Sequence, residues 1–369
     1  MRSTSRFLVS LSLLLALVAS ACGDDGDEAD APETPVDATT TEAPDGDNAA
    51  AGDDQDVDDT DGDDTGGDET ADTTTTTEAP PETRLVEHAL GTTEVPYAPQ
   101  RLVVVNAGTI LPTLIELGLQ DIIVGAPLPD EDELPTSLVT AEEIADITSV
   151  GWPESNFELT AAVEPDMIIG FDQGMEDVYD EFSAIAPTVA VASDLNDWKF
   201  TAQEIADAIG RGDEMQAALA AYEERAAALR DALGDDIDTE VSVIRAIGAN
   251  IRLHTKYHFA GQVLDDVGLA RPDTQQTDDP SERYIQVSLE EMQRADADVM
   301  YIFGAGTFGS AGDGLNEAIR AVQEHPLYPT LRVAQNDTLY VVDPLGWQQG
   351  GLPAALLILD DLERTLLGE

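Results

Sequence analysis

The feature that most constrains this chain is one uninterrupted helical stretch, residues 213–234, with the sequence DEMQAALAAYEERAAALRDALG. Strong helix formers fill it without proline, and Gly234 stands where a helix commonly ends. Asp213, with Gln216 three residues later, predicts an N-cap and a capping box. One face carries an apolar stripe at helical spacing, made of Met215, Leu219, Tyr222, Ala226, Leu229 and Leu233.

Such a helix is about 30 Å long, which is roughly the width of a small domain. One strand-and-helix pattern precedes it in residues 84–212, and another follows it in residues 235–369. An ordinary amphipathic helix would show the same stripe. The flanking patterns favour a rigid connection between two α/β lobes, and a folded part of this size is large enough for two.

The first 22 residues have the pattern of a secretory signal, with Arg2 and Arg6 before an apolar run and small residues at its end. The run is too short for a comfortable membrane span. Cys22 follows it and is the only cysteine of the chain, so no disulfide can form within one molecule. A cysteine at this place resembles the lipobox of bacterial lipoproteins, in which the thiol is lipidated, although Ala19 stands where leucine is usual. A plain signal peptide is the alternative.

Residues 23–83 form an acidic segment with 23 Asp and Glu and neither Lys nor Arg. They lack the aromatic and branched apolar residues that offset the entropy of ordering, so we expect a disordered tether that is swollen by its own charge. The remaining residues, 84–369, hold 52 acidic and 15 basic side chains. This balance argues against nucleic acid as a partner.

Short apolar segments alternate with amphipathic ones in both halves, which favours parallel sheets covered by helices on both faces. Strands are expected at residues 102–106, 121–125, 147–151, 167–171, 188–191, 241–246, 299–303 and 338–342. Helices are expected at residues 109–117, 156–163, 179–186, 200–210, 260–267, 287–294, 315–323 and 352–367.

An internal repeat also indicates two similar lobes. Glu158 is followed eight residues later by Asp166 and an apolar strand, and Glu290 is followed eight residues later by Asp298 and another apolar strand. Coincidence is the alternative, because the spacing is short and acidic residues are abundant.

The sequence has no phosphate-binding loop, dinucleotide fingerprint or nucleophile elbow. His254 and His258 have a spacing that could chelate a metal on a helix, but no carboxylate lies in that segment, and surface or loop positions are the simpler interpretation. We therefore expect no enzymatic activity, no cofactor and no resident metal site.

Candidate binding residues stand after the expected strands, where open α/β sheets bind their ligands. Arg245 and Arg252 are notable in so acidic a chain, because a guanidinium binds oxyanions and stacks on rings. Salt bridges for the arginines and core packing for the aromatic residues are the alternatives. The candidates are Asn106, Thr109, Trp152, Phe171, Gln173, Tyr179, Arg245, Arg252, Tyr257, Phe303, Phe308 and Trp347.

Several segments together resemble the substrate-binding lipoproteins of iron–siderophore and cobalamin ABC importers, over residues 82–367. They are EVPYAPQRLVVVNAGTILPTLIELGLQDIIVGAP, GWPESNFELTAAVEPDMIIG, YDEFSAIAPTVAV, FAGQVLDDVGLARPDTQQ, VSLEEMQRADADVMYIF and GWQQGGLPAALLILDDL. The resemblance implies a periplasmic-binding-protein type of fold, with two Rossmann-like lobes, a rigid helical linker at residues 213–234 and a ligand in the cleft between the lobes. It also implies that Glu158 and Glu290, one per lobe, dock on arginines of a permease.

The same resemblance implies positions in the cleft. Arg252 and Tyr257 resemble the cleft-lining stretch of the ferric-siderophore branch, as does the RP-x-x-x-Q motif at residues 271–276. Trp152 and Trp347 match tryptophans on the cleft side.

The expected function is the capture of a ferric siderophore by a monomeric protein that is lipid-anchored on the extracytoplasmic face of the cell membrane. The protein would deliver the siderophore to an ABC permease and its ATPase. The nearer alternative is the same fold binding haem, cobalamin or a metal ion. The more distant alternative is a secreted bilobed enzyme or ligand sensor.

Overall fold

The computed structural model describes three stretches, residues 82–129, 137–304 and 313–368. The described residues belong to one compact unit. The predictions for the signal, for Cys22, for most of the tether and for Phe308 lie outside the described residues. None of the described helices is long and apolar enough to span a membrane.

The first lobe is built on a parallel five-stranded sheet in the order β5-β4-β3-β6-β7. The strands are β3 (Leu102–Val104), β4 (Ile123–Ala126), β5 (Thr148–Ser149), β6 (Met167–Phe171) and β7 (Thr188–Val191). The helices are α1 (Ile110–Glu116), α2 (Phe157–Ala162), α3 (Tyr179–Ser183) and α4 (Trp198–Ala208). An antiparallel hairpin, which the sequence pattern does not predict, consists of β1 (Thr83–His88) and β2 (Gly91–Pro96).

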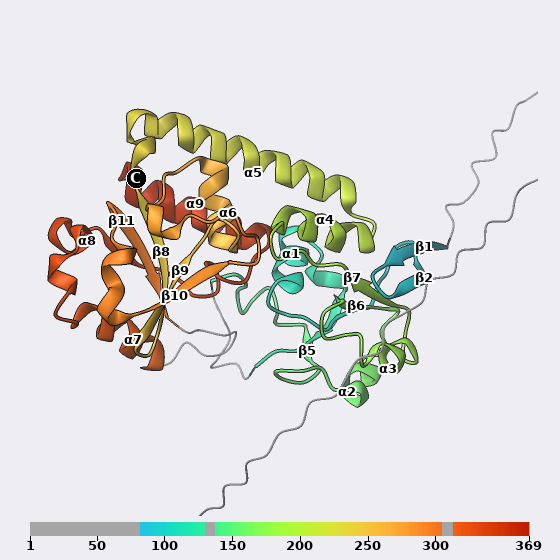
Figure 1. Ribbon diagram of the computed structural model, residues 1–369. Helices are drawn as coiled ribbons and strands as arrows, with labels where there is room; N and C mark the ends of the chain where they lie inside the picture. The colour runs from blue at the N-terminus through green and yellow to red at the C-terminus, as the bar shows by residue number, and fades with distance from the viewer. Residues whose placement is uncertain (1–81, 130–136, 305–312, 369) are drawn as a thin grey trace, which may run out of the picture. The chain divides into compact units, whose positions relative to one another are not determined.

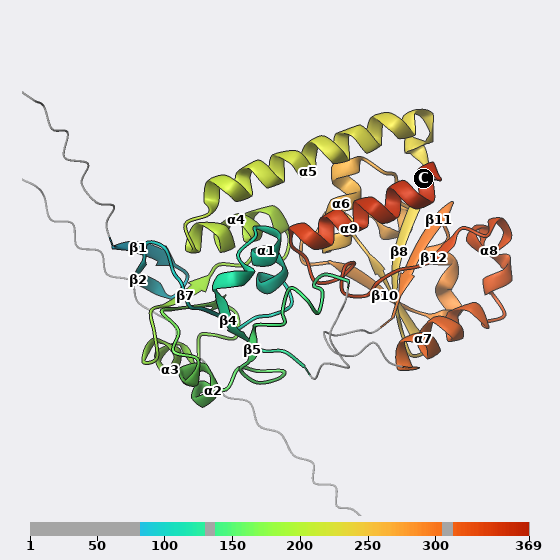
Figure 2. The same ribbon diagram turned by 180° about the vertical axis from the view of Figure 1, so that it is seen from behind.

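The second lobe has a mixed sheet in the order β10-β9-β8-β11-β12, which corrects the expectation of a parallel sheet. β8, β11 and β12 are parallel, whereas β9 is antiparallel to both β8 and β10. The strands are β8 (Val241–Ile247), β9 (Asn250–His254), β10 (Tyr284–Ser288), β11 (Val299–Phe303) and β12 (Leu339–Val341). The helices are α6 (Phe259–Val267), α7 (Asp313–Gln323), α8 (Arg332–Asn336) and α9 (Leu352–Leu362). α6 and α9 pack on one face of the sheet, and α7 and α8 on the other (Figures 1 and 2).

The predicted helix at residues 287–294 is wrong in its first part. Val287 belongs to strand β10, whose side chains alternate between exposed and more buried positions, as a strand at a sheet edge requires. The chain becomes helical only at the short 3₁₀ helix η5 (Leu289–Ala295).

The long helix predicted from the sequence is present as α5 (Gly212–Leu233), labelled above the two sheets in Figure 1. It ends at Gly234, whose φ of +53° explains why a glycine stands there. Its start differs from the prediction, because Arg211 is the N-cap residue and no side chain caps the helix. Asp213 lies instead in the first turn, where a negative charge still interacts favourably with the helix dipole.

The apolar stripe of α5 packs against the hydrophobic core. Met215, Tyr222, Ala226, Leu229 and Leu233 are buried, and Leu219 is partly buried against the same core. This packing connects the stripe to residues of α4, α6 and α9, so the helix contacts elements of both lobes.

Polar contacts strengthen the connection between α5 and its neighbours. Lys199 of α4 forms ion pairs with Glu223 of α5 at 3.1 Å and with Asp266 of α6 at 3.0 Å. The buried Tyr222 hydroxyl donates to the other carboxylate oxygen of Asp266 at 2.9 Å. One lysine therefore joins the first lobe, the long helix and the second lobe.

The repeated aspartates occupy equivalent structural places in the two lobes. Asp166 accepts hydrogen bonds from the backbone N–H groups of Gln100 and Arg101, just before β3. Asp298 accepts one from the backbone N–H of Glu240, just before β8. β3 and β8 are the middle strands of their sheets, so each aspartate fixes the start of a central strand. This equivalence supports two related lobes over coincidence.

Candidate functional site

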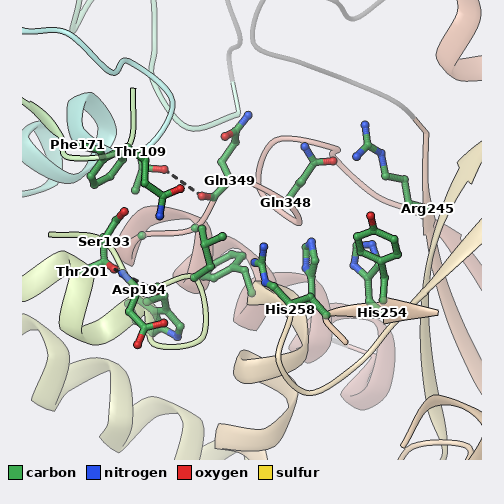
Figure 3. A pocket seen from close by; sticks show the side chains of 18 of the residues that line it. Thr109, Phe171, Ser193, Asp194, Thr201, Arg245, His254, His258, Gln348 and Gln349 are labelled. Carbon is green, nitrogen blue, oxygen red and sulfur yellow. Dashed lines mark hydrogen bonds between the residues drawn. The ribbon is translucent and has the colours of Figure 1, made fainter. Parts of the chain in front are cut away.

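A cavity of about 440 Å³ lies between side chains of the two lobes (Figure 3). A volume of this order is typical of small-molecule sites. The first lobe contributes residues that include Thr109, Phe171, Gln173, Ser193, Asp194 and Trp198. The second lobe contributes residues that include Arg245, Arg252, His254, His258, Arg283, Tyr284 and Gln349.

Three arginines from neighbouring strands meet at the cavity. Arg245 on β8 and Arg252 on β9 are directly opposite each other in the antiparallel register, and Arg283 immediately precedes β10. The Arg252 guanidinium lies 4.1 Å from the centroid of the Tyr284 ring, in cation–π geometry. Arg283 Nε donates to the Tyr257 carbonyl at 3.3 Å.

These guanidinium groups are not neutralised by acids. Within the part of the chain that the structure describes, Arg245, Arg252 and Arg283 form no ion pair with a carboxylate. Burial, and then the charge of Arg252, lower the pKa of Arg245, and its buried Nε has no hydrogen-bond partner among the described residues. Burial also lowers the pKa of Arg283, while Asp194 across the cavity acts in the opposite direction. The side chains nevertheless stay cationic, so this wall carries uncompensated positive charge.

Two closely packed histidines form the adjoining part of the wall. His254 ends β9 and His258 precedes α6, and their ring centroids are 3.7 Å apart. The edge of Phe303 packs against His254, with centroids 5.3 Å apart. Burial, followed by Arg283 and Arg245, lowers the pKa of His258 to about 3, and burial lowers that of His254 well below its ordinary value. Both imidazoles are therefore neutral at pH 7.

The first lobe supplies the opposite wall. Thr109 Oγ1 donates to the Gln349 carbonyl at 3.0 Å, a direct hydrogen bond between the lobes that Figure 3 marks with a dashed line. Phe171 reaches the cavity at the end of β6, and its backbone N–H donates to Asn106 Oδ1 at 2.7 Å. Trp198 lies edge-on to Phe259, with ring centroids 6.0 Å apart.

Five of the predicted binding residues line this cavity, namely Thr109, Phe171, Gln173, Arg245 and Arg252. Asn106 is absent from the lining but positions the backbone of Phe171. Tyr257 lies outside it, and its hydroxyl donates to the Asp278 carbonyl at 3.3 Å. Trp152 is 38% exposed on the first lobe and does not line the cavity.

Three predicted aromatic residues serve packing in the structure, which corrects their expected places in the cleft. Trp347 is fully buried, stacks on Tyr301 with centroids 4.5 Å apart, and donates from Nε1 to Asp361 at 2.8 Å. Phe303 is also fully buried and reaches the cavity only through the His254 ring. Tyr179 bonds to the Thr188 carbonyl at 3.1 Å, away from the cavity.

The sequence prediction missed Arg283, Tyr284 and the cavity position of the two histidines. Strands β9 and β10 were not expected, and their antiparallel register is what places Tyr284 opposite His254. The RP-x-x-x-Q motif lies behind this wall, where the buried Arg271 donates to the carbonyls of His254 at 3.2 Å and Gly261 at 2.6 Å. Arg271 thus supports the wall without lining the cavity.

Glu158 and Glu290, the predicted docking residues, are both exposed. Glu158 lies in the first turn of α2, and Glu290 lies in the first turn of η5.

Two α/β lobes, a long helix packed against both and a ligand-sized cavity between them define a bilobed ligand-binding protein. The chain belongs to the periplasmic binding protein family, whose model matches residues 103–345.

Similar proteins include the probable siderophore-binding lipoprotein YfiY of Bacillus subtilis (strain 168), which is 31% identical over 295 residues. That alignment covers 78% of this chain and 88% of the relative. The Fe(3+)-citrate-binding protein YfmC of the same organism is 26% identical, with 72% and 80% covered. The crystal structure of Staphylococcus aureus SirA complexed with staphyloferrin B superposes with a TM-score of 0.66 at 25% identity, and covers 77% of this chain and 99% of that one.

Proposed function

We propose that this protein captures a ferric siderophore in the cavity between its lobes and delivers it to an ABC permease and its ATPase. The relatives, which are named for siderophores or ferric citrate, support this cargo. The protein acts by binding alone and carries out no reaction on its cargo.

The observation that carries the proposal is the group of three unpaired arginines in a chain of net charge −58. None of the three forms an ion pair with a carboxylate among the described residues, and all three line the cavity. An anionic chelate supplies the missing negative charge, and each charge-assisted hydrogen bond contributes about 1.5–3 kcal/mol. In a chain of this net charge, the arginines mark the cavity as a place where an anion can bind.

Titration with ferric chelates tests the cargo. Trp198 lines the cavity, so binding of an absorbing iron complex should quench its fluorescence. We expect micromolar or tighter binding of at least one member of a panel of ferric catecholates, hydroxamates and citrate-type chelates. Trp198→Phe is the matched control, which should lose most of the quenching but still bind by calorimetry. Absence of binding to every member would contradict the proposal.

We further propose that Glu158 and Glu290 dock on the permease and that Cys22 carries a lipid that holds the protein on the extracytoplasmic face of the membrane. Both glutamates are exposed, one on each lobe, as docking requires. The relative YfiY is named a lipoprotein, which supports the anchor. Docking by one molecule needs no second copy, so we expect a monomer.

Cells that depend on this protein for iron test delivery. Glu158→Ala combined with Glu290→Ala should leave chelate affinity unchanged and abolish uptake of labelled iron, because the two carboxylates are away from the cavity. Lost affinity in the purified double variant would show that the acids serve the binding site instead.

In the same cells, Cys22→Ala should move the protein from the membrane fraction to the soluble one, and an unchanged distribution would rule out the lipid anchor.

A further inference from the structure

His254 and His258 form a buried pair of neutral imidazoles. Anion binding by the arginines assigns these two side chains no role. The residues are 1% and 7% exposed, and both belong to the lining of the cavity. Nδ1 of each ring is buried without a hydrogen-bond partner among the described residues. Figure 3 shows both side chains on the part of the wall that also carries Arg245. Buried polar atoms normally have partners, so the two unpaired Nδ1 atoms bear on which nitrogen of each ring carries the proton.

The charges around the two rings exclude a bare cation. The charged groups that act on both rings are cationic, namely Arg245, Arg271 and Arg283, and Arg252 acts in the same way on His258. No group of three or more metal-binding side chains occurs among the described residues. A free metal ion would therefore be repelled here, whereas iron that arrives inside an anionic chelate is not.

The histidines could either coordinate the iron of such a chelate or donate hydrogen bonds to its oxygen atoms. The environment of Nδ1 distinguishes these two possibilities. A histidine that binds a metal through one nitrogen almost always donates the other N–H to a carboxylate or a carbonyl. Neither ring has such an acceptor for Nδ1 in the part of the chain that the structure describes. With the proton on Nε2 instead, Nδ1 is left only as an unpaired acceptor, and a donor is presented to the cavity.

We propose that His254 and His258 donate hydrogen bonds from Nε2 to oxygen atoms of the bound chelate and do not coordinate its iron. The cargo is then an oxygen-rich, anionic chelate that supplies all six iron ligands itself. This inference rests on the proposed function and narrows its substrate class. It also gives the arginines and histidines one common task, since all of them donate hydrogen bonds to oxygen.

Pulsed electron paramagnetic resonance of the loaded wild-type protein tests the inference directly. The probes are a hexadentate ferric tris-catecholate, a hexadentate ferric tris-hydroxamate and a tetradentate ferric bis-catecholate. We expect a hexadentate chelate to bind best and its iron to show no coupling to an imidazole nitrogen. An imidazole coupling to the iron, or tighter binding of the tetradentate chelate, would overturn the inference.

Variants supply a second readout. His258→Phe keeps a flat ring but removes the donor, and should weaken binding of the preferred chelate about 10-fold. His258→Gln places an N–H near the former Nε2 and should restore most of the affinity. His325→Phe, which lies outside the cavity, is the control for loss of a histidine. Unchanged affinity in His258→Phe would overturn the role of the histidines while leaving the proposed function intact. Failure of wild-type protein to bind any ferric chelate would overturn both.

Discussion

At the scale of single residues, the neutral state of the buried histidines has a consequence for stability. An unfolded histidine takes up a proton near its ordinary pKa of about 6.5, but folded His258 stays neutral down to a pKa of about 3. Between these values the unfolded chain binds more protons, so the free energy of unfolding falls as the pH is lowered. Burial is the main cause of the lowered pKa of His258, and the charges of Arg283, Arg245, Arg271 and Arg252 add to it, while the His254 ring packs against it.

We expect His258→Phe to reduce this acid sensitivity. Between pH 7.5 and pH 5, the protonation of His258 in the unfolded chain should lower the free energy of unfolding of the wild-type protein by about 2 kcal/mol. The variant lacks this imidazole, so its free energy of unfolding should not fall by that amount. Urea denaturation at the two pH values measures the difference. His325→Phe, at a half-buried position outside the cavity, is the matched control. Equal acid sensitivity in the two variants would contradict the assignment of a buried neutral imidazole.

Residue identity predicted the charged part of the site better than its aromatic part. Arg245 and Arg252 were found from the sequence because unpaired arginines are unusual in so acidic a chain. Trp347 was placed wrongly because an indole can line a cleft or fill a core, and only the Asp361 acceptor and the Tyr301 ring reveal which. Nothing in the sequence distinguishes these two environments, because both partners are distant in the chain.

At the scale of the elements, the cavity wall depends on how closely α6 approaches the backbone of Thr255, between the two histidines. A Cβ atom on Gly261 would lie 2.0 Å from the Thr255 carbonyl oxygen, a backbone atom that cannot rotate away. Gly261→Ala should therefore destabilise the fold by about 1–3 kcal/mol and also weaken chelate binding, because Thr255 lies between the two histidines in the chain.

Gly212→Ala is the control for this prediction. Its Cβ would meet the side chains of Asp207 and Gln203 in place of backbone, and side chains can turn away. Thermal unfolding of the two variants measures the contrast. A Gly261→Ala protein as stable as Gly212→Ala would show that Gly261 is not in close contact with the Thr255 carbonyl.

Strands with continuous apolar runs were predictable from the sequence, and the antiparallel strands β9 and β10 were not. β6 and β11 match their predicted bounds, because a buried strand needs an unbroken apolar sequence. β9 and β10 were missed, because an antiparallel pair at the edge alternates exposed and buried residues and contains Arg252. The site depends on these strands, so missing them also concealed Arg283 and Tyr284.

At the scale of the whole folded unit, the long helix and the two lobes followed from the sequence, but the cavity did not. α5 was recognisable because its length, stripe and terminal glycine are local properties. The cavity arises where strand ends of one lobe face those of the other, and contacts such as Thr109 to Gln349 join residues 240 positions apart. The packing of α5 and the ion pairs of Lys199 hold the lobes together, so we expect only small closure on binding.

The proposed function requires an anionic iron chelate to bind to the unpaired arginines. Calorimetric titration of the preferred ferric chelate into the wild-type protein and into a triple variant, Arg245→Gln, Arg252→Gln and Arg283→Gln, tests this most directly. Arg211→Gln, which removes an exposed arginine at the start of α5, is the control. We predict that affinity falls at least about 100-fold in the triple variant and is unchanged in the control. Equal affinity in the triple variant and the wild type would contradict the account.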